Sequence, residues 1–157
     1  MASNPKNRNR AIATAGNNIG ITRYQLYKRA YARINESIKQ GFYLEAISLI
    51  ESLISDRLES RLTLLKGSDF GFKTLGQLIS QINRVETDSQ LKDFVTNNLD
   101  SWRLVRNKAL HEMAKLADGD TSTWDDRMKA LVPCAKDGLV ILRAIDKRYR
   151  QLRKLKV

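Results

Sequence analysis

The chain has 157 residues, of which 42% are hydrophobic, with eight glycines and two prolines. This length fits a single domain with a substantial core. No apolar run approaches the roughly 18 to 20 residues of a membrane span, and residues 1–16 lack the apolar core of a signal peptide. The one cysteine, Cys134, cannot form an internal disulfide, and its apolar neighbours favour a buried, inert thiol over a nucleophile. We therefore expect a cytoplasmic protein with no membrane partner.

The net charge of +11 is concentrated at the two ends of the chain. Residues 1–40 contain eight Lys or Arg and one acid, and residues 143–157 contain seven and one. Residues 41–142 contain thirteen basic and fifteen acidic residues. Basic ends of this kind bind a polyanion through its phosphates, largely without regard to sequence. On this basis we expect RNA as a partner; the alternative is a role in solubility alone.

The first elements in chain order are a basic arm and two helices. Residues 1–20 have no apolar period and are rich in Asn, Arg and Gly, which predicts a disordered arm. Thr22 is predicted to cap a helix that Gly41 ends. A second helix is predicted from Phe42 to Leu65, because one apolar stripe recurs along it at helical spacing: Leu44, Ile47, Ile50, Ile54, Leu58, Leu62 and Leu65.

Two more helices are predicted after a Gly-rich loop at residues 66–73. Thr74 opens a short helix with apolar residues on one side. Asp88 caps a longer one that we expect to run to about Leu116. The buried face of this longer helix is predicted to consist of Leu91, Phe94 or Val95, Asn98, Trp102, Val105 or Arg106, Ala109 and Met113.

The last helix is predicted to run from Thr123 to about Leu152. Ser122 with Asp125 resembles a capping box in which Asp replaces the usual Glu. Pro133 lies inside this helix and should kink or interrupt it, since proline removes a backbone donor.

The predicted fold is all-α. No strand pattern or repeat is found, and helices joined by short loops favour an up-and-down bundle of about five helices over residues 21–157. Basic residues beside the single histidine and along the wet side of the last helix are the predicted nucleic-acid contacts: Arg103, Lys108, Arg143, Lys147 and Arg150.

The only histidine, His111, follows Arg106 by five residues and Asn107 by four. Cleaving RNA without a metal requires a proton-transfer group, a cation on the phosphate and a means of holding the nucleotide in line. Imidazole, with an unperturbed pKa of about 6.5, suits the first role. The arginine fork matches phosphate oxygens and suits the second. Asn107 is suited to orienting either partner.

Helical geometry separates Arg106 from His111. Five residues correspond to about 140° around a helix of 3.6 residues per turn, so one straight helix does not point both side chains at one small target. Two such helices meeting about a two-fold axis would pool two arginines and two histidines in one cleft. We therefore expect a homodimer whose site straddles the interface, although this spacing by itself is common on ordinary helices.

Glu51 lies inside the apolar stripe of the second predicted helix. A carboxylate on such a face is costly unless another group satisfies it. Two interpretations are open: Glu51 is a paired structural residue, or it orients Arg106 or His111.

From Phe42 onward the chain resembles the HEPN family (higher eukaryotes and prokaryotes nucleotide-binding domains). The resemblance covers most of residues 22–150 and is carried by residues 42–54 (FYLEAISLIESLI), 74–79 (TLGQLI) and 102–111 (WRLVRNKALH). The last segment looks like that family's Arg-x4–6-His signature, in which a polar residue, often Asn, follows the Arg.

The resemblance implies a compact helical bundle that dimerises and cleaves RNA without metal or cofactor, leaving a 2′,3′-cyclic phosphate. It also implies a toxin, phage-defence or RNA-processing setting, with an antitoxin or other regulatory protein as a further partner. Carried over by residue, Arg106 binds and polarises the phosphate, His111 transfers a proton or positions the hydroxyl, and Asn107 holds the site together. Glu51 corresponds to the polar residue on the preceding long helix.

Met113 stands where one subset of the family has a tyrosine. This difference argues against the variant that is paired with a tyrosine-modifying nucleotidyltransferase antitoxin. Two other hypotheses stay open at this point: a basic helical RNA-binding module without chemistry, and a bundle whose apolar face binds a regulatory protein.

Overall fold

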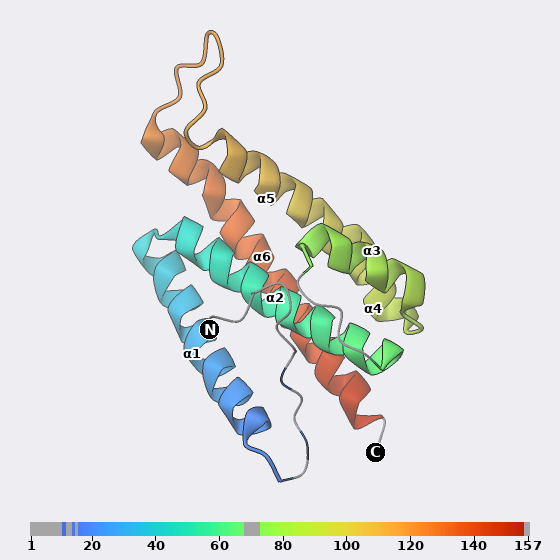
Figure 1. Cartoon of the computed structure of the whole chain (residues 1–157). Coiled ribbons are helices and arrows are strands. Elements are labelled where there is room, and N and C mark those ends of the chain that lie inside the picture. Colours follow the sequence, from blue (N-terminus) through green and yellow to red (C-terminus); the bar gives the residue numbers. More distant parts are fainter. Residues whose placement is uncertain (1–10, 12–13, 15, 68–72, 156–157) are drawn as a thin grey trace, which may run out of the picture.

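The computed structural model describes residues 11, 14, 16–67 and 73–155. Throughout this part of the chain the regular structure is helical (Figure 1). The elements are α1 (Ile19–Gln40), α2 (Tyr43–Lys66), α3 (Leu75–Val85), α4 (Ser89–Asp93), the π-helical segment η2 (Phe94–Leu99), α5 (Asp100–Glu112) and α6 (Trp124–Lys154). Because α4, η2 and α5 follow one another without a break, the fold is a bundle of five helices, which confirms the predicted all-α class.

Helix α2 is central to the bundle. It contacts α1, α3 and α6, and Figure 1 shows it crossing between α1 and α3 with α6 behind it. Its predicted apolar stripe is the core of the protein, where the fully or nearly fully buried side chains include Ile47, Ile50, Ile54, Leu58 and Leu62. None of the helices described is long and apolar enough to cross a membrane.

Several predicted helix boundaries require correction. Helix α1 begins at Ile19 after Asn18, so Thr22 is not its cap, and the helix starts within the segment predicted to be a disordered arm. Most of that arm, and most of the loop at residues 66–73, lies outside the described residues. Helix α5 ends at Glu112, before Leu116.

The start of α6 is displaced by one position from the prediction. Its cap is Thr123, whose side chain and that of Asp126 form the capping box predicted for Ser122 and Asp125. The helix then continues through Pro133, so of the two predicted outcomes, a kink or an interruption, the interruption does not occur. Buried residues on both sides of the proline, Leu131, Cys134 and Ala135, keep this stretch packed on the core.

The π-helical segment η2 changes which residues of the following helix face the core. A π-helix takes more residues per turn than an α-helix, so it shifts a pattern based on 3.6 residues. Leu99 is fully buried, whereas the predicted Asn98 is exposed. Further along, Val105 is 59% exposed and Arg106 is the residue that turns inward.

Two arginines of α2 contact neighbouring parts of the bundle through ion pairs, and one of them also stacks on aromatic rings. The guanidinium of Arg57 lies 4.1 Å from the ring centroid of Tyr27 on α1 and 4.8 Å from that of Tyr149 on α6, and it pairs with Asp146 at 2.7 Å. Stacking and ion pairing together let this cation lie inside the bundle.

Arg61 forms the second of these links, a buried pair with Glu86 at the end of α3. Its Nε and Nη2 each donate to a Glu86 oxygen at 2.7 Å, and Glu86 also accepts hydrogen bonds from the backbone N–H groups of Thr87 and Asp88. Burial opposes ionisation of Glu86, but these hydrogen bonds outweigh it and hold the pKa of Glu86 below its ordinary value.

We expect Glu86→Gln to lower the free energy of unfolding by about 3 kcal/mol near neutral pH, because it leaves Arg61 charged, buried and unpaired. Since the folded pKa of Glu86 is depressed, its contribution is present above the unfolded pKa of about 4.3 and is lost as pH falls through the folded value. Urea unfolding of both proteins at several pH values measures the difference. The exposed Glu36→Gln is the control of equal charge, and an equal effect from both changes would refute the prediction.

Candidate functional site

The contact between Trp102 and α6 determines how α5 lies in the bundle. The indole Nε1 donates a hydrogen bond of 2.8 Å to the backbone carbonyl of Cys134. A Cβ atom on Gly138 would lie 2.7 Å from Cζ2 of the indole, so only glycine permits this approach. Burial raises the pKa of the Cys134 thiol, which agrees with the predicted inert, buried cysteine.

With Trp102 fixed against α6, α5 presents faces of different chemistry. At about 100° per residue, Arg106 points inward with Trp102, while Leu104, Lys108 and His111 lie together on the opposite side. Burial agrees with this geometry, because the latter three are exposed and Arg106 is largely covered.

Glu51 of α2 and Arg106 of α5 form an ion pair. Arg106 Nη2 donates to Glu51 Oε1 at 2.6 Å, and the two side chains are 14% and 29% exposed for Arg106 and Glu51 respectively. The pair uses one of the five guanidinium donors. The buried Nε of Arg106 has no acceptor among the described residues, and Glu51 is the one hydrogen-bond partner of the guanidinium found there.

This ion pair borders a cleft of about 820 Å³ between α2, α5 and the start of α3. The side chains of Arg103 and Asn107 line the same cleft. The guanidinium of Arg103 packs over Gly76, where a Cβ would lie 3.4 Å from its Nη1. The α2 wall carries carboxylates as well as hydroxyls, so cations and acids face each other across the cleft: Glu51, Ser52, Ser55, Asp56 and Glu59.

His111 does not line this cleft. It lies in the last turn of α5 with an exposed side chain. The structure thus brings four of the predicted residues together, namely Glu51, Arg103, Arg106 and Asn107, and leaves His111, one turn beyond Asn107, outside the cleft.

The other predicted nucleic-acid contacts are dispersed. Lys108 is exposed on the outer face of α5, and Arg143, Lys147 and Arg150 are exposed along α6. Arg150 pairs with the buried Asp146 at 2.8 Å, so part of its charge is already compensated. These three residues of α6 do not border the cleft.

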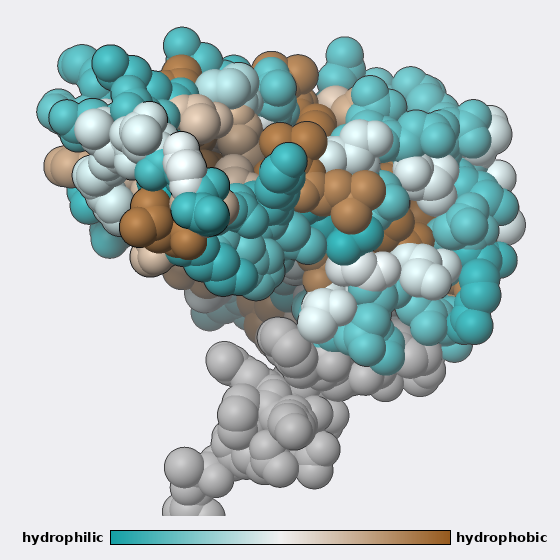
Figure 2. Space-filling view, turned by 90° about the horizontal axis from the view of Figure 1, so that it is seen from above, coloured by the Kyte–Doolittle hydropathy of each residue, from teal (hydrophilic) through white to brown (hydrophobic). Residues whose placement is uncertain are grey.

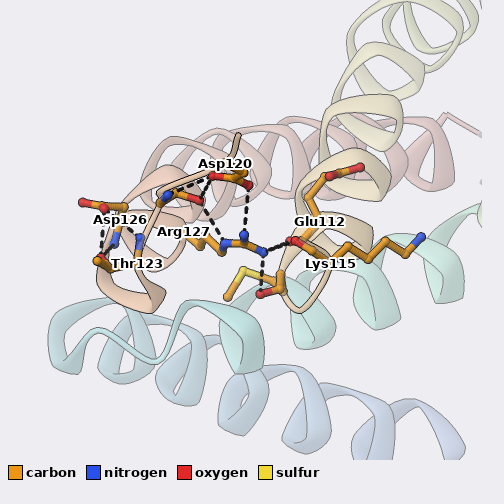
Figure 3. A network of polar contacts seen from close by, with 8 residues as sticks. Glu112, Lys115, Asp120, Thr123, Asp126 and Arg127 are labelled. Atoms are coloured by element: carbon orange, nitrogen blue, oxygen red, sulfur yellow. Dashed lines mark hydrogen bonds and ion pairs between the residues drawn. The ribbon is translucent and has the colours of Figure 1, made fainter. Parts of the chain in front are cut away.

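A network around Arg127, which sequence reasoning missed, holds the end of α5 to the start of α6 (Figure 3). Arg127 of α6 donates to three backbone carbonyls at the end of α5 and pairs with Asp120 at 3.0 Å. An arginine in the first turns of a helix looks like an ordinary solvated charge, so the sequence carries no signal for this contact.

The surface around this end of the bundle is mostly hydrophilic with separate hydrophobic patches, as the view from above shows (Figure 2). Residues 112–126 contain five carboxylates and one lysine, so the segment that follows His111 is acidic in an otherwise basic protein.

No group of three or more His, Cys, Asp or Glu suited to holding a metal occurs within the described ranges.

Comparison with known proteins gives no relatives. No protein-family model matches the chain, and no significant match was found among curated proteins or among solved structures.

Replacing Gly138 with alanine tests the contact that orients α5. The added methyl group would overlap the indole of Trp102, and we expect a loss of about 1–3 kcal/mol despite the better helix propensity of alanine. Gly76→Ala is the control, since a Cβ there would lie 3.4 Å from the end of the Arg103 side chain, close to ordinary contact, and the propensity gain should dominate. Urea unfolding of both variants decides; equal stability of the two would show that α5 does not depend on this approach.

Proposed function

We propose that the protein is a homodimeric, metal-independent endoribonuclease of the HEPN type. The observation that carries the proposal is the position of Arg106, which is held by Glu51 at the wall of a large cleft and lies on the same helix as the only histidine. An arginine oriented by a carboxylate is prepared to bind a planar oxyanion such as a phosphate, because it keeps its charge and retains free donors.

In the proposed reaction, Arg106 on one face of α5 would contact the phosphate and His111 on the outer face would transfer protons. The 2′-oxygen of the RNA attacks the adjacent phosphorus and loses its proton, the bond from phosphorus to the 5′-oxygen breaks, and that oxygen gains a proton. Arg106, with Arg103 beside it, would stabilise the charge on the phosphate oxygens. The His111 imidazoles of two copies would accept the first proton and donate the second, and Asn107 would hold the nucleotide in line. The products are a 2′,3′-cyclic phosphate and a 5′-hydroxyl.

The outer face of α5 supports the dimer that this division of labour requires. Leu104 is 55% exposed on the same side as His111. Beside it, the exposed Val105 and Val140 border a mainly apolar groove of about 610 Å³ between α5 and α6. An exposed leucine on the side of α5 that carries His111 favours burial of that side against another copy of the same surface, which a two-fold axis would bring face to face.

A second candidate function, RNA binding without chemistry, is favoured by two observations. His111 lies outside the cleft, and the acidic segment that follows it would repel phosphate. In that case the exposed cations of α6 would be the functional residues. An RNA that is bound in a salt-sensitive manner and stays intact after long incubation would support this candidate.

Cleavage of labelled RNA by the purified protein in excess chelator tests the nuclease. We expect His111→Ala and Arg106→Ala each to reduce the rate by about 100-fold or more, because each removes a group that acts in the transition state. Since the residues act as one unit, the double variant should lose little more than either single one. Ser80→Ala, exposed on α3 and away from both the cleft and the groove, is the control. Intact RNA with the wild-type protein, or undiminished cleavage by His111→Ala, would refute the proposal.

Leu104→Glu tests the dimer separately from the chemistry. A charge on this exposed side chain should leave the monomer folded but oppose burial of the face against a second copy. We expect a smaller sedimentation coefficient and loss of cleavage, together with a wild-type activity that falls on dilution. Leu155→Glu changes another exposed leucine, which lies after α6, and should have neither effect. A Leu104→Glu protein that is monomeric and fully active would contradict the shared site.

A further inference from the structure

One guanidinium makes most of the polar contacts where α5 ends. Arg127 Nη1 donates to the carbonyl oxygens of Glu112 at 2.5 Å, Met113 at 3.2 Å and Lys115 at 2.6 Å. Its Nε donates to Ser122 Oγ at 3.1 Å, and its Nη2 donates to Asp120. Figure 3 shows Arg127 reaching from α6 between Asp120 and the end of α5.

Arg127 is itself held in place from the loop side. Asp120 accepts hydrogen bonds from the backbone N–H and the hydroxyl of Ser122, and it pairs with Nη2 of Arg127. These contacts lower the pKa of Asp120, the hydrogen bonds from Ser122 being the main cause, so the carboxylate stays charged. The Asp120 carboxylate, the Ser122 hydroxyl and the Arg127 guanidinium therefore hydrogen-bond to one another. These bonds orient Nη1 of Arg127 toward the carbonyls at the end of α5.

The carbonyls that Arg127 contacts lie at and just beyond the C-terminus of α5. Glu112 is the last residue of the helix, Met113 caps it, and Lys115 follows in the connecting turn, from which its N–H donates to the Glu112 carbonyl at 3.4 Å. The last carbonyl groups of an α-helix have no intrahelical donor, and a cation near them is favoured by the helix dipole. No residue in the last turn of α5 besides His111 is basic. Arg127 supplies both the donors and the charge from another helix, so the geometry of this turn depends on a residue that is distant in the chain.

His111 is the residue immediately before the first of these carbonyls. Within the described ranges the imidazole makes no hydrogen bond or ion pair, and its side chain is exposed. Its position is therefore set by the backbone of the turn that carries it. A loosened turn would leave the imidazole on the surface but no longer at one place.

We propose that Arg127 is a positioning residue for His111: by bridging the α5 carbonyls to Asp120, it fixes the turn from which the imidazole acts. The inference rests on the proposed nuclease function for its catalytic consequence. Its physical part, the placement of the imidazole, can be measured without any activity.

Arg127→Ala is the direct test, with Lys129→Ala as the control that removes an equal charge from an exposed position on the same helix. Because His111 is the only histidine, its two ring C–H signals in the NMR spectrum are unambiguous. We expect these signals to move in Arg127→Ala and the amides of residues 110–115 to exchange faster. For cleavage we expect kcat to fall by about 10- to 100-fold, since a small misplacement of a catalytic group is costly, while KM changes little.

Millimolar guanidinium ion should restore part of kcat and move the imidazole signals back in Arg127→Ala, and should do neither in His111→Ala. Asp120→Asn provides a milder variant should Arg127→Ala not fold, with the same direction of effect. Unchanged imidazole signals, or an unchanged kcat in a protein whose α5 end exchanges faster, would overturn the inference. RNA left intact by the wild-type protein would instead overturn the nuclease proposal, and the imidazole signals would still decide on the role of Arg127.

Discussion

The packing of an indole directly on a glycine of the neighbouring helix is the constraint on which the site depends. Trp102 approaches α6 so closely that Gly138 has no room for a side chain, and its ring nitrogen is tied to the Cys134 carbonyl. A helix fixed at such a contact has little freedom to rotate about its axis. The direction of every other side chain of α5 follows from that rotation.

The two candidate reactive groups consequently lie on different faces of one rigid helix. Arg106 turns toward α2, where Glu51 holds it at the cleft, and His111 turns outward beside Leu104. A single copy therefore cannot bring both groups to one phosphate without distorting α5. In the proposed dimer, a two-fold axis would bring the outer faces of two α5 helices together, so that two imidazoles lie at one interface and the Arg106 clefts of both copies flank it.

The cleft and the segment that follows α5 differ in their charged contacts. At the cleft, Arg106 pairs with Glu51 of α2 and Arg103 pairs with Asp100 of its own helix, which orients both cations and limits the strength with which any one phosphate is held. The segment after α5 is acidic and is organised by Arg127. In the proposed enzyme, this segment keeps the chain after His111 folded in one arrangement, while affinity for RNA comes from the exposed cations elsewhere.

The sequence predicted the elements of this arrangement better than the contacts between them. The stripe of α2 and the inward position of Trp102 follow from helical periodicity, and Glu51 is conspicuous because it interrupts that stripe. The choice between Arg106 and His111 as its partner depends on how two helices cross, which periodicity does not contain. The fit of Trp102 to Gly138 is likewise a property of packed surfaces.

Two predictions about single positions were wrong, and each error has a local physical cause. The π-helical turn before α5 moved Leu99 into the place predicted for Asn98, because its hydrogen bonds span more residues than those of an α-helix. The α6 cap moved from Ser122 to Thr123, since neighbouring hydroxyl residues offer nearly equivalent caps. Neither change alters the class of the fold.

The most direct measurement of the central claim is the proximity of the two α5 helices in the particle that cleaves RNA. Spin labels would be attached at Lys108→Cys, one turn from His111 on the outer face, in a Cys134→Ala background that removes the native thiol. Helices packed against each other have axes about 8–10 Å apart, so we expect strong dipolar broadening between the two labels in the proposed dimer. An active particle whose labels show no dipolar coupling would contradict it.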